Sequence, residues 1–190
     1  FSYMKKDSIK INRALKLVNQ IQKIRSKNNK NWMDLLKLSL KLDMNSIENM
    51  LKGKRVLITG AGGSIGSELV KQCLSFSPAE IICLDTREES IYKLEQFFSK
   101  IHSKTVSKTV LASVNIEKEC DKVFSENRPH IVFHAAAYKH VPIQELHPWT
   151  AVNTNLGGTY NMVRLSDKYS VDKFVLVSTD KAVNPVNVMG

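Results

Sequence analysis

The stretch RVLITGAGGSIGSELV, residues 55–70, decides the fold of this chain. An apolar run at its start leads directly into glycines at positions 60, 62, 63 and 66, and a segment with helical character follows. A strand that runs into closely spaced glycines and then into a helix is typical of the first turn of a dinucleotide-binding βαβ unit. The N–H groups and the positive dipole end of such a helix bind phosphate. We therefore predict that this stretch cradles the pyrophosphate of a dinucleotide.

The glycines are expected to have separate roles. Gly60 permits the sharp turn from strand to helix, and Gly66 lets the helix pack closely on the sheet. Either Gly62 or Gly63 lets the backbone approach the pyrophosphate. A glycine-rich turn without a ligand is the alternative, and the strand before it and the helix after it argue against that reading. The predicted cofactor loop comprises Gly60, Gly62, Gly63, Ser64, Ile65 and Gly66.

Four more short apolar runs, separated by segments with helical periodicity, lie at residues 81–85, 109–112, 131–134 and 173–178. Alternation of apolar strands with amphipathic helices predicts an α/β fold with a doubly wound parallel sheet, the Rossmann fold. Because a complete sheet of this class has about six strands, we expect a truncated domain. Residues 1–54 are predicted to form a basic helical arm, and residues 55–190 an NAD(P)-binding domain that is incomplete at its carboxyl end.

The positive charge is concentrated at the start of the chain. Residues 1–54 hold thirteen Lys or Arg against four Asp or Glu, whereas residues 55–190 hold fifteen against fourteen. Residues 11–21 have the apolar spacing of an amphipathic helix, and a second short helix, capped by Asn45, fits residues 46–52. We predict that this arm docks on an anionic membrane face, with a merely solvated arm as the alternative. Nucleic acid is disfavoured because aromatic residues are not interleaved with the basic ones.

Other patterns bear on the compartment and on metals. No apolar run reaches the roughly 18 residues that a transmembrane helix needs, and the three cysteines lack C-x-x-C spacing. We expect reduced thiols and a cytoplasmic protein, brought to the inner face of a membrane by the basic arm. His134 and His140 have no third ligand at suitable spacing, so no metal is expected.

Asp85 ends the second apolar run, nineteen residues after Gly66. A carboxylate at this place accepts hydrogen bonds from the adenosine ribose hydroxyls and repels a 2′-phosphate, which favours NAD over NADP. Two alternatives stay open. Arg87 could hold a 2′-phosphate, and Asp85 could simply cap the next helix.

Three further strings accompany the G-x-x-G-x-x-G loop: HAAAYKHVP at 134–142, NTNLGGTYN at 153–161 and STDKAVNP at 178–185. Together they resemble the CapD-like polysaccharide biosynthesis family of nucleotide-sugar 4,6-dehydratases, within the extended short-chain dehydrogenase/reductase superfamily. The resemblance covers roughly residues 40–190. It implies a UDP-N-acetylhexosamine substrate for bacterial surface polysaccharide, NAD or alternatively NADP as cofactor, and a homo-oligomer. Larger members carry amino-terminal transmembrane helices, which would suit the internal start at Phe1 and the basic arm.

The resemblance also implies site residues. It places Asn115 and Ile116 against the adenine, although Asp is frequent at the first of these positions. It places Asn153 in the helix that shapes the site. The small side chains that would lie beneath the nicotinamide are Ala135, Ala136 and Ala137. The residues that would face the sugar nucleotide are Tyr138, Lys139 and His140.

A 4,6-dehydration needs a base at sugar C5 and an acid at the 6-hydroxyl. By the resemblance, Thr179 binds the 4-oxygen, Asp180 is the acid and Lys181 is the base. An exposed Asp–Lys pair after a strand is the alternative. The register puts Met189 where the superfamily has its proton-transferring Tyr, and the supporting Lys would fall beyond Gly190. We therefore expect this chain alone to be inactive.

Two other functions remain open at this point. A nucleotide-sugar 4-epimerase is the nearest enzyme alternative, and it needs no acid for a 6-hydroxyl, so Asp180 beside Lys181 favours dehydration. A non-catalytic NAD(P)-binding module is the second, and Met189 favours it because Met cannot transfer a proton.

Overall fold

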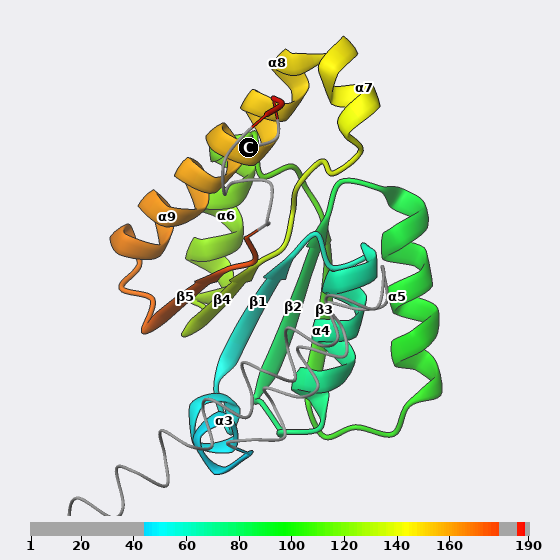
Figure 1. Cartoon of the computed structure of the whole chain (residues 1–190). Helices are drawn as coiled ribbons and strands as arrows, with labels where there is room; N and C mark the ends of the chain where they lie inside the picture. Colours follow the sequence, from blue (N-terminus) through cyan, green and yellow to red (C-terminus); the bar gives the residue numbers. More distant parts are fainter. Residues whose placement is uncertain (1–43, 179–185, 189–190) are drawn as a thin grey trace, which may run out of the picture. The chain divides into compact units, whose positions relative to one another are not determined.

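The computed structural model describes residues 44–178 and 186–188. Within them, five parallel strands form one sheet in the order β3-β2-β1-β4-β5 (Figure 1). The strands are β1 (Arg55–Thr59), β2 (Glu80–Asp85), β3 (Val106–Leu111), β4 (Ile131–His134) and β5 (Lys173–Leu176). The predicted Rossmann-type parallel sheet is confirmed.

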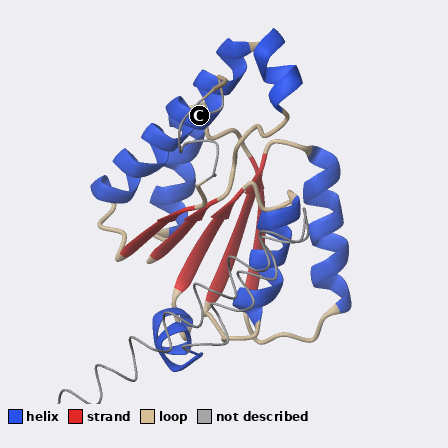
Figure 2. Cartoon of the chain, viewed as in Figure 1, coloured by secondary structure: helices blue, strands red, loops and turns tan. Residues whose placement is uncertain are grey.

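Helices cover both faces of this sheet (Figure 2). Helices α4 (Ser64–Leu74) and α5 (Glu88–Lys100) pack on one face, and α6 (Glu117–Asn127) and α9 (Thr159–Lys168) lie together on the other. The remaining described helices are α3 (Met44–Leu51), α7 (Val141–Leu146), α8 (Pro148–Ala151) and the π-helix η1 (Val152–Gly158), which continues into α9.

The direction of winding reverses beside β1. The chain proceeds from β1 to β2 and β3 on one side, then crosses to β4 and β5 on the other. In open α/β sheets, ligands bind outside the carboxyl ends of the strands at such a reversal. The glycine-rich loop follows β1 and the HAAAYKH string follows β4, so the two segments leave the sheet side by side at this point.

Burial distinguishes the central strands from the edge strands. Every residue of β2 and β4 is buried, as are four of the five residues of β1. By contrast, β3 and β5 are partly exposed, since each pairs with one neighbour only among the described strands. Strand β3 begins at Val106 rather than at the predicted 109, because it pairs along the whole of β2.

Two helix predictions need correction. The spacing of Tyr160, Val163 and Leu165 predicts one apolar face for the helix before β5. Helix α9 buries Leu165 together with Met162, whereas Tyr160 and Val163 are exposed. Helix α3 includes Asn45, which therefore does not cap it from outside. One compact unit begins at Asn45 and contains the sheet and all but the first residue of α3, while the division predicted between residues 54 and 55 stays a prediction.

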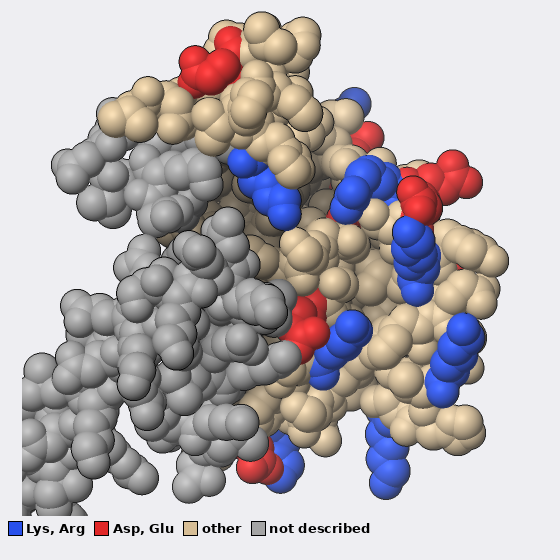
Figure 3. Space-filling model, turned by 45° about the vertical axis from the view of Figure 1, so that its right-hand side comes forward, with Lys and Arg blue, Asp and Glu red and all other residues tan. Residues whose placement is uncertain are grey.

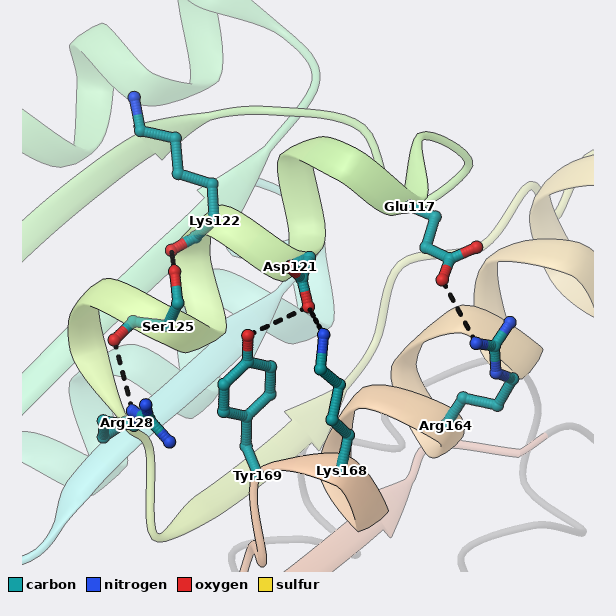
Figure 4. A network of polar contacts seen from close by, with 8 residues as sticks. All are labelled: Glu117, Asp121, Lys122, Ser125, Arg128, Arg164, Lys168 and Tyr169. Carbon is teal, nitrogen blue, oxygen red and sulfur yellow. Dashed lines mark hydrogen bonds and ion pairs between the residues drawn. The ribbon is translucent and has the colours of Figure 1, made fainter.

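A polar network joins α6 and α9 on the surface (Figure 4). The Asp121 carboxylate accepts hydrogen bonds from Lys168 Nζ at 2.6 Å and from the Tyr169 hydroxyl at 3.0 Å. The guanidinium of Arg128 lies 4.7 Å from the centre of the Tyr169 ring. These contacts fix the carboxyl end of α9, whose amino end continues η1 beside the predicted site.

The described face of the molecule in Figure 3 carries charges of both signs. Figure 3 shows Lys and Arg side chains interspersed with Asp and Glu rather than gathered into a patch of one sign. None of the helices in residues 44–178 is long and apolar enough to cross a membrane. The predicted helix over 11–21, the predicted catalytic residues Thr179, Asp180 and Lys181, and Met189 all lie outside the described residues.

The three cysteines are free and buried. Burial raises the pKa of Cys73 and of Cys120 to about 12, and it raises the pKa of Cys83 as well. These thiols therefore stay protonated at neutral pH, in line with the reduced state expected from the sequence.

Candidate cofactor and substrate site

The glycine-rich loop lies directly against the segment that follows β4. Gly60 has a φ of +64°, in the left-handed region that favours glycine, so it makes the turn out of β1. A Cβ at Gly60 would also lie 2.7 Å from the Ala136 Cα. The loop and the alanine segment therefore touch backbone to backbone, which a larger residue at position 60 would prevent.

Gly62 and Gly63 differ in what surrounds them. A Cβ at Gly62 would overlap the Ser90 side chain of α5, whereas a Cβ at Gly63 would meet only the Gly60 carbonyl oxygen, at 3.2 Å. Gly62 is thus required by the packing of the protein on itself. Gly63 precedes α4 without a side-chain cap, so the space beside it and the first N–H groups of α4 are available to an anion.

Asp85, at the end of β2, holds the glycine-rich loop in place through a hydrogen bond. Its side chain is 5% exposed, and its Oδ2 accepts a hydrogen bond from the Gly62 N–H at 2.9 Å. Its Oδ1 accepts one from the Arg87 N–H at 3.0 Å, and the Arg87 side chain lies beside the same oxygen. Helix α5 begins at Glu88 with Arg87 before it, so the alternative that Asp85 caps this helix is wrong.

The alanines after β4 form a low wall beside the loop. Ala135 and Ala136 are half-buried, and Ala137 is exposed. The Ala135 N–H donates to the Thr59 carbonyl oxygen at 3.2 Å, which continues the pairing of β4 with β1 for one residue past the strand. Small side chains at this place keep the region in front of the glycine-rich loop open.

Tyr138, Lys139 and His140 are exposed and follow this wall. The Asn155 amide holds the Tyr138 backbone at both polar atoms: its Oδ1 accepts from the Tyr138 N–H at 2.8 Å, and its Nδ2 donates to the Tyr138 carbonyl at 3.0 Å. The Lys139 Nζ lies 3.5 Å from the Ser64 Oγ, at the start of α4. The structure therefore brings the Lys139 ammonium over the glycine-rich loop, toward the place where phosphate would bind.

His134 is buried among hydroxyl groups rather than facing a ligand. Its Nδ1 lies 2.6 Å from the Thr59 Oγ1, and its Nε2 lies 3.0 Å from the Thr159 Oγ1. Burial lowers the pKa of His134 to about 4, so the ring is neutral at pH 7. The sequence had suggested His134 only as a metal candidate to be rejected, and the hydroxyl partners at 59 and 159 lie too far along the chain to be recognised from spacing.

The residues predicted at the adenine lie at the end of β3. Ile116 is exposed, and the Asn115 Nδ2 donates to the Thr154 Oγ1 of η1 at 3.0 Å. Asn153, predicted to shape the site, is exposed on η1. Asn155 is instead the residue of η1 that reaches the segment after β4, and the N-x-x-G-T spacing of residues 155–159 is the signal that could have indicated it.

After β5 the described chain reaches the carboxyl ends of the strands, where the glycine-rich loop also lies. The Val177 N–H donates to the His134 carbonyl oxygen at 3.0 Å, so residue 177 lies beside the end of β4. The structure thus brings together the glycine-rich loop, Asp85, the alanine wall and Lys139. The predicted catalytic triplet begins at the residue after Ser178, outside the described residues.

Known proteins have sequences similar to this one. A family described as "Polysaccharide biosynthesis protein" matches residues 56–190. The capsular polysaccharide biosynthesis protein CapD of Staphylococcus aureus is 45% identical over 152 residues, which cover 80% of this chain and 25% of CapD.

Two further relatives carry different activities in their names. A UDP-N-acetylglucosamine 4,6-dehydratase (inverting) of Campylobacter jejuni is 35% identical over 143 residues, covering 74% of this chain and 41% of the dehydratase. A UDP-glucose 4-epimerase of Rickettsia canadensis is 37% identical over 145 residues, with the same two coverages of 74% and 41%. The chain thus spans between 25% and 41% of the length of these relatives.

Solved structures have the same fold. Pen from Bacillus thuringiensis superimposes with a TM-score of 0.68 at 30% identity, over 74% of this chain and 42% of Pen. The UDP-glucose 4-epimerase of Thermus thermophilus, solved in complex with NAD, gives a TM-score of 0.52 at 25% identity, over 63% of this chain and 36% of the epimerase.

The matched region begins at Val56 and includes the loop, the alanine wall and the η1 segment. Because the family match covers well over half of the chain, the chain belongs to the polysaccharide biosynthesis protein family.

Proposed function

We propose that the protein is an NAD(P)-dependent 4,6-dehydratase of a UDP-N-acetylhexosamine in bacterial surface polysaccharide synthesis. The observation that carries the proposal is the uncapped start of α4 behind Gly63, faced by Lys139 and flanked by the alanine wall. The relatives named as a 4,6-dehydratase and as CapD support the substrate class.

The described residues fit a dinucleotide. Gly63 leaves room for a pyrophosphate, the α4 start supplies N–H donors, and Ala135 and Ala136 leave a flat surface for a ring. When bound, a nicotinamide ring accepts hydride from sugar C4 and later returns it to C6. We propose that Lys139 binds the cofactor phosphates rather than the sugar, because its Nζ lies at the Ser64 hydroxyl.

The choice between NAD and NADP depends on the end of β2. We propose NAD, because the buried Asp85 carboxylate would repel a 2′-phosphate. The opposing group is Arg87, whose side chain is 64% exposed beside Asp85 and would attract that phosphate. Binding constants for the two cofactors, compared between the wild type and Arg87→Ala, would decide between these two groups.

The acid and the base are proposed from the sequence alone. Lys181 would remove the C5 proton, Asp180 would protonate the departing 6-hydroxyl, and Thr179 would hydrogen-bond the 4-oxygen. The decisive experiment incubates the protein with UDP-N-acetylglucosamine and measures the product by mass spectrometry. Loss of one water supports dehydration, and it should disappear in Lys181→Ala and in Asp180→Asn.

Two alternative outcomes have specific support. A product of unchanged mass but altered sugar stereochemistry would make the protein a 4-epimerase, as the name of the Rickettsia relative suggests. NAD(H) binding without any sugar product would make it a non-catalytic cofactor-binding module, as Met189 at the Tyr position suggests.

We further propose that residues 1–190 alone do not turn over substrate. The chain covers 41% of the dehydratase relative, and catalysis depends on holding the sugar against the nicotinamide, which can contribute about 7–11 kcal/mol. An assay of this chain beside a version extended to the length of that relative tests the point. Equal product from both would contradict it.

We also propose that residues 1–54 bring a cytoplasmic enzyme to an anionic membrane face and that the enzyme assembles with copies of itself. The excess of basic residues in that segment supports the first part. Binding to phosphatidylserine vesicles should fall steeply with ionic strength, and equal binding to neutral vesicles would contradict an electrostatic mechanism. Light scattering in solution would measure the number of copies.

A further inference from the structure

A continuous chain of hydrogen bonds connects the strand before the glycine-rich loop with the segment after the alanine wall. It passes from the Thr59 hydroxyl to the His134 ring, from that ring to the Thr159 hydroxyl, and from there to the Asn155 carbonyl oxygen. The Asn155 side chain then holds both backbone polar atoms of Tyr138. The five residues come from β1, β4, η1, the start of α9 and the segment after β4 (Figure 1).

The direction of each bond follows from the one donor that each hydroxyl possesses. The Thr159 hydroxyl donates to the Asn155 carbonyl at 2.6 Å, so it can only accept from the His134 Nε2–H. The His134 Nδ1 is then unprotonated and accepts the Thr59 hydroxyl proton. Thr59 is left to accept from the Ala136 N–H at 3.4 Å, which the structure also shows. With His134 neutral and protonated at Nε2, every donor and acceptor in this series of hydrogen bonds has a partner.

This series of hydrogen bonds ends at an exposed segment, whose last residue, His140, also accepts from the Ile143 and Gln144 N–H groups of α7. Tyr138, Lys139 and His140 are exposed, and the two bonds to Asn155 hold the first of them. Asn155 in turn lies in a π-helix, a conformation that occurs mostly as single turns inside α-helices and is frequent at functional sites. The Thr159 bond to the Asn155 carbonyl therefore fixes the residue whose side chain positions Tyr138.

We propose that His134 and Thr159 are positioning residues that hold the 138–140 segment in register with the glycine-rich loop. The imidazole spans the interval between β1 and the start of α9, and its two nitrogens offer the one acceptor and one donor that the two hydroxyls need. An effect on substrate binding rests on the proposed function, since it assumes that Tyr138 and His140 face a UDP-sugar. The effect on the position of Tyr138 does not.

The matched pair Thr159→Val and Thr159→Ser tests this series of hydrogen bonds. Valine has the shape of threonine without the hydroxyl, whereas serine keeps the hydroxyl. The amide hydrogen exchange of Tyr138 reports on its bond to Asn155. We expect exchange about tenfold faster in Thr159→Val, which corresponds to one lost hydrogen bond, and near wild-type exchange in Thr159→Ser. UDP-N-acetylglucosamine binding should weaken in parallel, and NAD(H) affinity should fall by no more than about fivefold, the loss expected from Lys139→Ala.

Ser166→Ala provides the matched control. The Ser166 hydroxyl is buried and donates to the Met162 carbonyl at 2.7 Å, so it makes the same bond four residues back in the same helix, away from Tyr138. This variant should lower stability without changing Tyr138 exchange. Equal acceleration in Ser166→Ala and Thr159→Val would overturn the proposal and make Thr159 an ordinary core contact, as would unchanged Tyr138 exchange in Thr159→Val.

Failure of the proposed function is distinguishable from failure of this inference. If the wild type binds no UDP-sugar but Thr159→Val still accelerates Tyr138 exchange selectively, the positioning role holds and the proposed substrate is wrong. If Thr159→Val does not fold, His134→Gln replaces it, since Gln can still donate but lacks the fixed ring geometry. Its Tyr138 exchange should then be faster than in Ser166→Ala, and equal rates would overturn the proposal.

Discussion

Two parts of the candidate site, the glycine-rich loop and the 138–140 segment, are held in place by different kinds of contact. The glycine-rich loop is fixed by backbone packing, with Gly60 against Ala136, Gly62 against Ser90, and Asp85 bonded to the Gly62 N–H. The 138–140 segment is exposed and depends on side-chain bonds that come through Asn155. Under the proposed function, the rigid loop faces the cofactor, and the more loosely held segment carries Lys139 toward the cofactor phosphates and Tyr138 and His140 toward the sugar.

The strongest test of this contrast separates two neighbouring glycines. Gly62→Val should destabilise the fold by about 3 kcal/mol or more, because its side chain overlaps Ser90. Gly63→Val should leave stability within about 1 kcal/mol of the wild type and abolish NAD(H) binding. Urea unfolding and cofactor titration of both variants measure the two effects. Retained NAD(H) affinity in a folded Gly63→Val would contradict the proposed cradle.

The next effect is acid sensitivity through His134. Burial lowers the His134 pKa from 6.5 to about 4. Between these two pH values the unfolded chain therefore binds a proton at this ring and the folded chain does not. Stability contributed by the neutral ring is therefore complete above pH 6.5 and is lost as pH falls toward 4. The expected loss is about 3 kcal/mol.

Urea unfolding at pH 7 and at pH 4.5 measures this loss, and His134→Gln should show a smaller difference between the two. His130→Gln is the control, because the pKa of His130 is also lowered, by burial and by Arg55 and Lys54, in a half-exposed position. If both variants reduce the difference in stability between pH 7 and pH 4.5 by the same amount, the acid sensitivity belongs to histidines in general rather than to the hydrogen bonds of His134.

A smaller effect is expected at Asp85. Removing its carboxylate leaves the Gly62 N–H without its acceptor, which costs about 1–3 kcal/mol. Asp85→Ala should therefore weaken both NAD and NADP binding by loosening the loop, in addition to narrowing any preference between them. Titration with each cofactor measures this. A change confined to the ratio of the two affinities would mean that Asp85 acts on the ribose alone.

The smallest effect is expected at Lys139. Because its ammonium is exposed, Lys139→Ala should reduce NAD(H) affinity by about fivefold, or roughly 1 kcal/mol, and less at high salt. Lys118→Ala, on the exposed side of α6, controls for the loss of one positive charge. If Lys139→Ala instead weakens UDP-sugar binding alone, the residue faces the sugar, as the family resemblance implied.

Much of the fold could be predicted from residues 55–70 and the apolar runs that follow. Buried parallel strands are continuous apolar runs, and glycines between a strand and a helix have few other uses. The errors occur where tertiary contacts decide. The start of β3 depends on pairing with β2, and the exposure of Tyr160 and Val163 depends on how α9 is rotated against the sheet.

By itself the sequence determined the class of fold, the place of the glycine-rich loop and the membership of the polysaccharide biosynthesis protein family. These features lie in short contiguous strings, because a strand, a turn and a helix start are local in the chain. Only the tertiary structure decided that Gly62 serves packing and Gly63 remains open, and that His134 joins two hydroxyls. Those contacts join residues 25 to 75 positions apart, and their spacing in the chain carries no signal until the sheet brings them together.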